Sequence, residues 1–114
     1  MQNEIVEFIQ PADDAPGRRC FTRERRNAHL KGENGTADIT LTINATDDFS
    51  GFYVRSSTNR GNGWARAKRS PTFATEVEAR TWADSKWATL RAWLSDVDAV
   101  AGPTASQIWS EQRR

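Results

Sequence analysis

Side chains that could perform catalysis are few in this chain of 114 residues. The sequence holds one His, one Cys and one Tyr, which are His29, Cys20 and Tyr53. A zinc site takes three or four ligands, and the further His and Cys residues that would complete a site with His29 are missing. A Cys20–His29 nucleophile pair has no recognisable oxyanion loop beside it. We therefore expect a protein that is not an enzyme and that needs neither a metal nor another cofactor.

Two other patterns resemble binding sites but fit turns better. Asp13–Asp14 and Asp47–Asp48 are adjacent carboxylates of the kind that bind Mg²⁺. Both pairs lie in turn-like segments, where Asp is common because its side chain hydrogen-bonds to nearby backbone. Gly61 and Gly63 beside Arg60 resemble part of a phosphate-binding loop, but the Gly-Lys-Ser/Thr ending of such a loop is missing. We predict turns at the Asp pairs and a hairpin tip at the glycines.

Basic side chains are concentrated in two segments, although the net charge is only +1. Residues 18–31 contain six basic residues and one acid, Glu24, and residues 49–75 contain five basic residues and no acid. This distribution is typical of a surface that binds nucleic acid. A solvated strand face would carry the same pattern, so both interpretations stay open.

Three strands are predicted in the middle of the chain. Apolar and polar residues alternate over 37–45, which indicates a strand with one buried and one wet face. Strands over 52–58 and 64–70 follow, and the Asn62-Gly63 pair between them is typical of a tight hairpin turn.

The N-terminal third is ambiguous. Residues 4–10 form a short apolar cluster that suits a strand or one helical turn, and residues 11–17 form a break rich in Pro, Asp and Gly. Residues 18–30 suit a strand by their alternation, or a short helix capped by Thr22. The periodicity does not decide between these alternatives.

A capping box begins at Thr75, whose hydroxyl can accept from the Glu78 amide while the Glu78 side chain reaches back. It predicts a long helix over 76–100, which Gly102 is placed to end, and a shorter helix follows over 104–112. The apolar stripe expected on the long helix consists of Ala79, Ala83, Trp87, Leu90, Leu94 and Val97, widened by Trp82 and Trp93.

These elements predict an α+β fold in one domain: an antiparallel sheet of three to four strands packed by one long helix, plus a short terminal helix. Within residues 1–114 the N-terminal segment spans 1–17, the sheet 37–70, the main helix 76–100 and the short helix 104–112. No stretch approaches about 20 apolar residues, and the N-terminus lacks the basic start of a signal peptide. We therefore expect a cytoplasmic protein without membrane contact.

The basic hairpin over the second and third predicted strands is the best candidate for a binding surface. If Arg55, Arg66 and Lys68 share the face opposite the helix, they form a cationic strip with Tyr53 and Trp64 among them. The smaller residues of the third strand would then lie beneath the helix. Such a strip can contact phosphates while its aromatic rings stack on bases. Alternatively, Tyr53 and Trp64 form a cross-strand pair that stabilises the hairpin, and the charges are only solvated.

The segment after the hairpin holds a further pattern, formed by Phe73, Thr75, Glu78, Ala79, Trp82 and Ala83. Together with the strand–turn–strand before it, this pattern resembles the arm-type, AP2-like DNA-binding domain of phage integrases. In that family a three-stranded sheet lies in the major groove and a helix braces its back. The resemblance implies that the strand residues of the basic hairpin would contact DNA. The chain departs from the family in having no recombinase domain and no basic residue over 37–45.

We expect a non-catalytic nucleic-acid-binding module that binds DNA or RNA through a basic β-hairpin face and is encoded by a phage or mobile element. The alternative is a small phage-type accessory protein that binds and modulates a host protein, as an inhibitor or adaptor. Exposed indole area at Trp93 or Trp109 would serve that alternative, or a homodimer. The predicted nucleic-acid-binding residues are Tyr53, Arg55, Arg60, Trp64, Arg66, Lys68 and Arg69.

Overall fold

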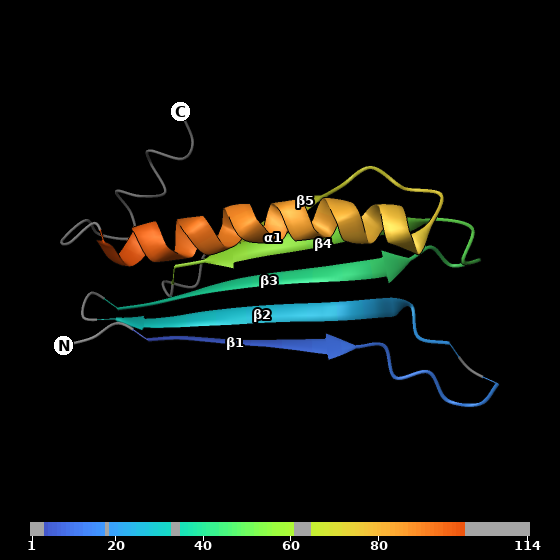
Figure 1. Ribbon diagram of the computed structural model, residues 1–114, viewed down its shortest axis with the longest axis horizontal. Coiled ribbons are helices and arrows are strands. Elements are labelled where there is room, and N and C mark those ends of the chain that lie inside the picture. Colours follow the sequence, from blue (N-terminus) through green and yellow to red (C-terminus); the bar gives the residue numbers. More distant parts are fainter. Residues whose placement is uncertain (1–3, 18, 33–34, 61–64, 100–114) are drawn as a thin grey trace.

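The computed structural model describes residues 4–17, 19–32, 35–60 and 65–99. Over these ranges the chain forms two layers, a sheet and a helix that lies along one of its faces (Figure 1). The strand order is β1-β2-β3-β4-β5, and every neighbouring pair is antiparallel. The elements are β1 (Glu4–Pro11), β2 (Thr22–Gly32), β3 (Gly35–Ala45), β4 (Phe52–Asn59), β5 (Ala65–Arg69) and α1 (Glu76–Ala99).

The sheet is larger than the sequence predicts, with five strands instead of three to four. Both ambiguous N-terminal segments are strands, β1 and β2, so the sheet begins within the predicted N-terminal segment over 1–17. Their own pattern is weak because β1 is exposed along most of its length. In the sheet, β2 is held by pairing with β3, and β1 is held by pairing with β2. The predicted central strands and main helix correspond to β3, β4, β5 and α1, whereas the short helix predicted over 104–112 lies outside the described residues.

The start of α1 is fixed by the predicted capping residues. The Glu78 amide donates to Thr75 Oγ1 at 3.2 Å, and the Thr75 hydroxyl donates to Glu78 Oε1 at 3.0 Å. The first bond satisfies one of the amides that a helix N-terminus leaves without an intrahelical partner. Among the described residues, no helix is both long and apolar enough to span a membrane.

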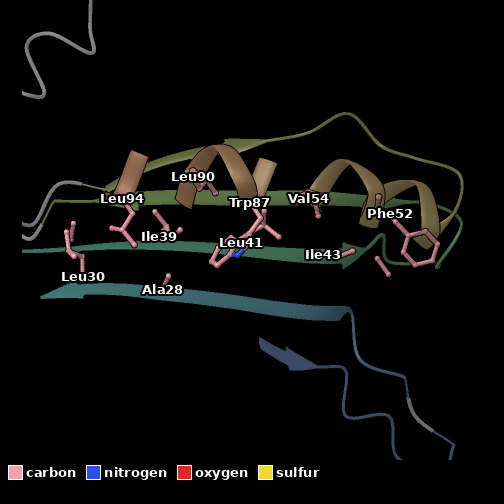
Figure 2. Packing of buried hydrophobic residues seen from close by; sticks show 14 residues of the cluster. Ala28, Leu30, Ile39, Leu41, Ile43, Phe52, Val54, Trp87, Leu90 and Leu94 are labelled. Carbon is pink, nitrogen blue, oxygen red and sulfur yellow. The ribbon is translucent and has the colours of Figure 1, made fainter. Parts of the chain in front are cut away.

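The core lies between α1 and the middle of the sheet (Figure 2). Alternate residues of β3, from Ala37 through Leu41 to Ala45, point toward the helix and are almost inaccessible to solvent. Phe52 and Val54 continue this layer on β4. The helix contributes Ala79, Ala83, Trp87, Leu90 and Leu94, as predicted, with Trp82 and Trp93 packed at the margins of the core.

The helix rests on β2, β3 and β4 and does not reach the two edge strands through its backbone. Only side chains connect it to β1. The Trp87 indole Nε1 donates to Glu7 Oε1 at 2.6 Å, and Arg91 Nε lies 3.3 Å from Glu7 Oε2. These contacts hold the β1 edge against the helix layer.

Charged side chains join β2 to α1 at the border of the core. Glu24 and Arg26 are 8% and 6% exposed, and Arg26 Nε donates to Glu24 Oε2 at 2.6 Å. From the helix, Arg80 donates to Glu24 Oε1 at 2.5 Å, and Asp84 accepts from Arg26 at 2.7 Å. Ionised groups can be buried here because each has a partner of opposite charge.

The same network continues toward the loop before β2. Arg23 donates through Nε to Glu76 Oε1 at 2.8 Å and through Nη1 to Asp14 Oδ1 at 2.8 Å. Glu76 also accepts from Arg80 at 3.3 Å, which completes the chain of ion pairs. The hydrogen bond that Arg23 donates to Asp14 lowers the pKa of Asp14 to about 2. The hydrogen bond from the same guanidinium to Glu76 lowers the pKa of Glu76.

Replacement of Leu41 by Ala should destabilise the fold by about 2–5 kcal/mol, because Leu41 is 0% exposed at the centre of the core. Val77→Ala is the matched control, since Val77 is 74% exposed on α1 and its truncation should change the free energy of unfolding by less than about 0.5 kcal/mol. Urea unfolding measures both values. Equal effects of the two substitutions would contradict the described core.

Acid should weaken the contribution of Arg23 to stability. The pKa values of Asp14 and Glu76 are lowered in the folded state. Their stabilising effect is therefore complete above the unfolded pKa of about 4 and is lost as the pH falls through the lowered values, which for Asp14 is about 2. The difference in unfolding free energy between the wild type and Arg23→Gln should therefore shrink from about pH 6 to about pH 2. A difference that stays constant in urea unfolding across this range would rule out these ion pairs.

Candidate nucleic-acid interface

The face of the sheet that points away from α1, here called the open face, has no covering layer among the described elements. Its central strand β3 presents Thr40, Thr42 and Asn44, which alternate with the buried core residues. At the β1 edge, Val6 and Phe8 are 55% and 56% exposed. The open face is therefore polar at its centre and partly apolar at one edge.

Three arginines form one row across the open face. Arg25 of β2 lies opposite Thr42 of β3, Thr42 lies opposite Arg55 of β4, and Arg55 lies opposite Arg69 of β5. Directly opposed residues in antiparallel strands share a face, so the three side chains emerge on the same side. We call Arg25, Arg55 and Arg69 the arginine row.

The arginine row carries positive charge that nearby carboxylates do not neutralise among the described residues. Arg55 and Arg69 are directly opposed like charges, an arrangement that destabilises a sheet on its own. The Arg69 guanidinium lies over the Tyr53 ring, 3.8 Å from the ring centroid, which gives that cation a partner. Within the part of the chain that the structure describes, neither Arg25 nor Arg55 has a carboxylate partner. The row is thus a local concentration of positive charge.

A hollow of about 480 Å³ lies beside the arginine row. Hydroxyl and amide groups line it, and the Asn44 amide donates to Thr42 Oγ1 at 2.9 Å. The Thr22 hydroxyl donates to Asn44 Oδ1 at 3.3 Å. None of the described lining residues is acidic. Such groups can exchange these weak surface bonds for contacts to phosphate oxygens or base edges.

The residues that the sequence predicts on one basic face lie on two different faces of the sheet. Tyr53, Arg55 and Arg69 lie on the open face, as the alternation of β4 predicts for the first two. Arg66 and Lys68 lie on the helix side, because they are opposite Thr58 and Ser56 of β4. The prediction that they share a face with Arg55 is therefore wrong.

The reason for this error is the position of the helix. The small residues of β5 are expected beneath α1, yet Ala67 is exposed on the open face. Because α1 has no backbone contact with β5, the helix side of β5 has room for long basic side chains. Arg60 directly follows the end of β4, and Trp64 is outside the described residues.

Arg25 belongs to the arginine row but is not among the residues that the sequence predicts for the interface. The pattern over residues 18–30 suits both a strand and a short helix, so it does not assign Arg25 to a face. The alternation of buried Glu24 and Arg26 with exposed Arg25 is the available signal, but it uses charged residues on both faces. Hydrophobic periodicity therefore does not reveal it.

The residues considered for catalysis or metal binding have local partners. Asp14 accepts from the Cys20 amide at 2.9 Å, and the Cys20 thiol donates to the Asp13 carbonyl at 3.1 Å. Hydrogen bonds from the hydroxyl and amide of Ser50 lower the pKa of Asp48 to about 2. His29 is hydrogen-bonded to Asp38 on the neighbouring strand. Over the described ranges, no group of three His, Cys, Asp or Glu side chains could hold a metal ion.

Comparisons with family models, with curated proteins and with solved structures give no match.

Proposed function

We propose that the protein is a non-catalytic nucleic-acid-binding module that uses the open face of its sheet. The observation that carries this proposal is the arginine row, because three cations are aligned there beside a hollow without acidic lining residues. The proposal agrees with the resemblance to the arm-type domain of phage integrases, in which a sheet contacts DNA and a helix braces its back. A phage or mobile-element origin rests on that resemblance.

The spacing of the arginine row suits a phosphate backbone. Neighbouring strands are about 4.8 Å apart, so Arg55 and Arg69 are one strand spacing apart and Arg25 is two spacings beyond Arg55. Each guanidinium is a planar group that binds phosphate oxygens with two parallel hydrogen bonds. Thr40, Thr42 and the neighbouring hydroxyl and amide groups could then contact sugars or bases.

Binding of a polyanion would also reduce the electrostatic repulsion between Arg55 and Arg69. Arg55 and Arg69 repel each other in the free protein, and a phosphate between them converts this repulsion into two attractive contacts. Tyr53 holds the Arg69 guanidinium over its ring in the free protein and could release it to the phosphate. The proposed contacts are mainly with the backbone, so we expect binding to be salt-dependent and weakly sequence-specific.

A second candidate function, binding to a host protein as an accessory protein, is favoured by the β1 edge. Val6, Phe8 and Ile9 are each more than half exposed there, and β1 has no partner on its outer side among the described strands. An unpaired strand with apolar side chains can accept a strand from another protein. DNA or RNA binding that is unaffected by changes in the arginine row would favour this candidate.

Fluorescence anisotropy with labelled single- and double-stranded DNA and RNA tests the proposal. Three phosphate contacts predict that affinity for duplex DNA falls about 40-fold between about 50 and 200 mM salt. The triple variant Arg25→Gln, Arg55→Gln, Arg69→Gln should lose most of this affinity and most of the salt dependence. Circular dichroism should be unchanged, because these side chains are outside the core.

The matched control is the double variant Arg66→Gln, Lys68→Gln, which removes cations from the opposite side of the same hairpin. It should retain most of the affinity and nearly all of the salt dependence. If the control loses binding and the triple variant keeps it, the open face is not the interface. If the wild type binds none of the four nucleic acids at low salt, the proposed function is wrong.

A further inference from the structure

A groove lies on the helix side of the sheet, between α1 and the β4–β5 hairpin. It exists because α1 contacts β2, β3 and β4, while β5 adds a further strand next to β4 that the helix backbone does not contact. Its volume is about 280 Å³. The groove opens on the other side of the sheet from the arginine row, because its basic sheet residues Arg66 and Lys68 point away from the open face.

Two cross-strand pairs form the sheet side of the groove. Ser56 lies opposite Lys68, and Thr58 lies opposite Arg66, so each basic side chain has a hydroxyl beside it. Ser56 is 5% exposed and lies at the bottom of the groove. Cations at the rim and hydroxyls beside them form a surface that can both neutralise an anion and donate hydrogen bonds to it.

The helix side of the groove adds a third cation and an aromatic ring. Lys86, Thr89, Leu90 and Trp93 follow the helical spacing of three or four residues and therefore lie on one stripe of α1. Lys86 faces the basic residues of β5 across the groove, and Trp93 is partly buried against the core. Among the lining residues that the structure describes, there is no carboxylate.

This combination of groups selects a particular kind of ligand. Cations from two elements that face one another repel unless an anion lies between them. A phosphate monoester carries up to two negative charges and several acceptor oxygens, which suits the lysines and hydroxyls. An indole at the side of the groove offers a flat apolar surface on which a nucleobase can stack. The volume is close to the lower end of small-ligand sites, which fits one nucleotide and excludes a duplex.

We propose that this groove binds a single nucleotide unit with a terminal phosphate, the phosphate between Lys68 and Lys86 and the base against Trp93. The unit is either a free nucleoside monophosphate or the 5′-phosphorylated end of a strand. The proposal does not depend on the function assigned to the open face.

Isothermal titration calorimetry of the full chain with adenosine monophosphate, adenosine and a 5′-phosphorylated dinucleotide tests this proposal. Binding of the monophosphate identifies a free nucleotide, and binding of the dinucleotide alone identifies a strand end. Adenosine should bind at least about tenfold more weakly, because it lacks the charge-assisted hydrogen bonds. If none of the three binds, or if adenosine binds as well as its monophosphate, the proposal is overturned.

Variants then locate the site. Lys68→Ala with Lys86→Ala should weaken binding of whichever phosphorylated probe binds by about 10- to 100-fold, and Trp93→Leu by about tenfold through lost stacking. The variant Lys31→Gln is the matched control: Lys31 is an exposed cation that belongs neither to the groove nor to the arginine row, so this variant should bind that probe like the wild type. Unchanged affinity in the lysine variant would overturn the proposal. Lys68 is exposed and Lys86 is only partly buried, so both changes leave the core intact.

Discussion

The structure depends on the mismatch between the width of one helix and the width of five strands. A helix with its side chains is about 10–12 Å across, whereas five strands spaced by about 4.8 Å span nearly twice that distance. α1 can therefore bury only the middle of the sheet, and the residues of β3 that face it are fully apolar. Polar or charged groups of β2 and β5 border the core on either side of the helix, whereas β1 keeps exposed apolar side chains such as Ile9.

The border of the core differs between the two sides of the helix. On the β2 side, Glu24 and Arg26 are nearly buried and form ion pairs with Arg80 and Asp84 from the helix. Burial of charges costs desolvation energy, so such a network stabilises little by its presence but strongly destabilises when one partner is removed. It also joins the helix to β2 at two positions, Arg80 and Asp84. On the β5 side the helix has no ionic partner among the described contacts, and a basic groove remains.

The sequence predicts the parts of the fold that have strong local signals. The capping box at Thr75 and the alternation of β3 come from short-range chemistry, and both agree with the structure. The sequence could not predict which face of β5 points to the helix side. If a helix covered β5, the face of Ala67 would fit beneath it, and without such a helix the face of Arg66 can lie there. The arginine row is harder still to predict from the sequence, because it arises from the register of four paired strands.

The meander topology determines which parts of the fold can form during synthesis. The strands leave the ribosome in the order in which they pair, so the sheet can assemble while α1 is still being synthesised. During that interval the apolar side of β3 has no cover, and newly made sheets could associate through it. The charged residues Glu24 and Arg26 flank this apolar strip before their helix partners arrive and would discourage such association. Glu24 and Arg26, which pair with the helix in the finished fold, thus also limit association of the nascent sheet.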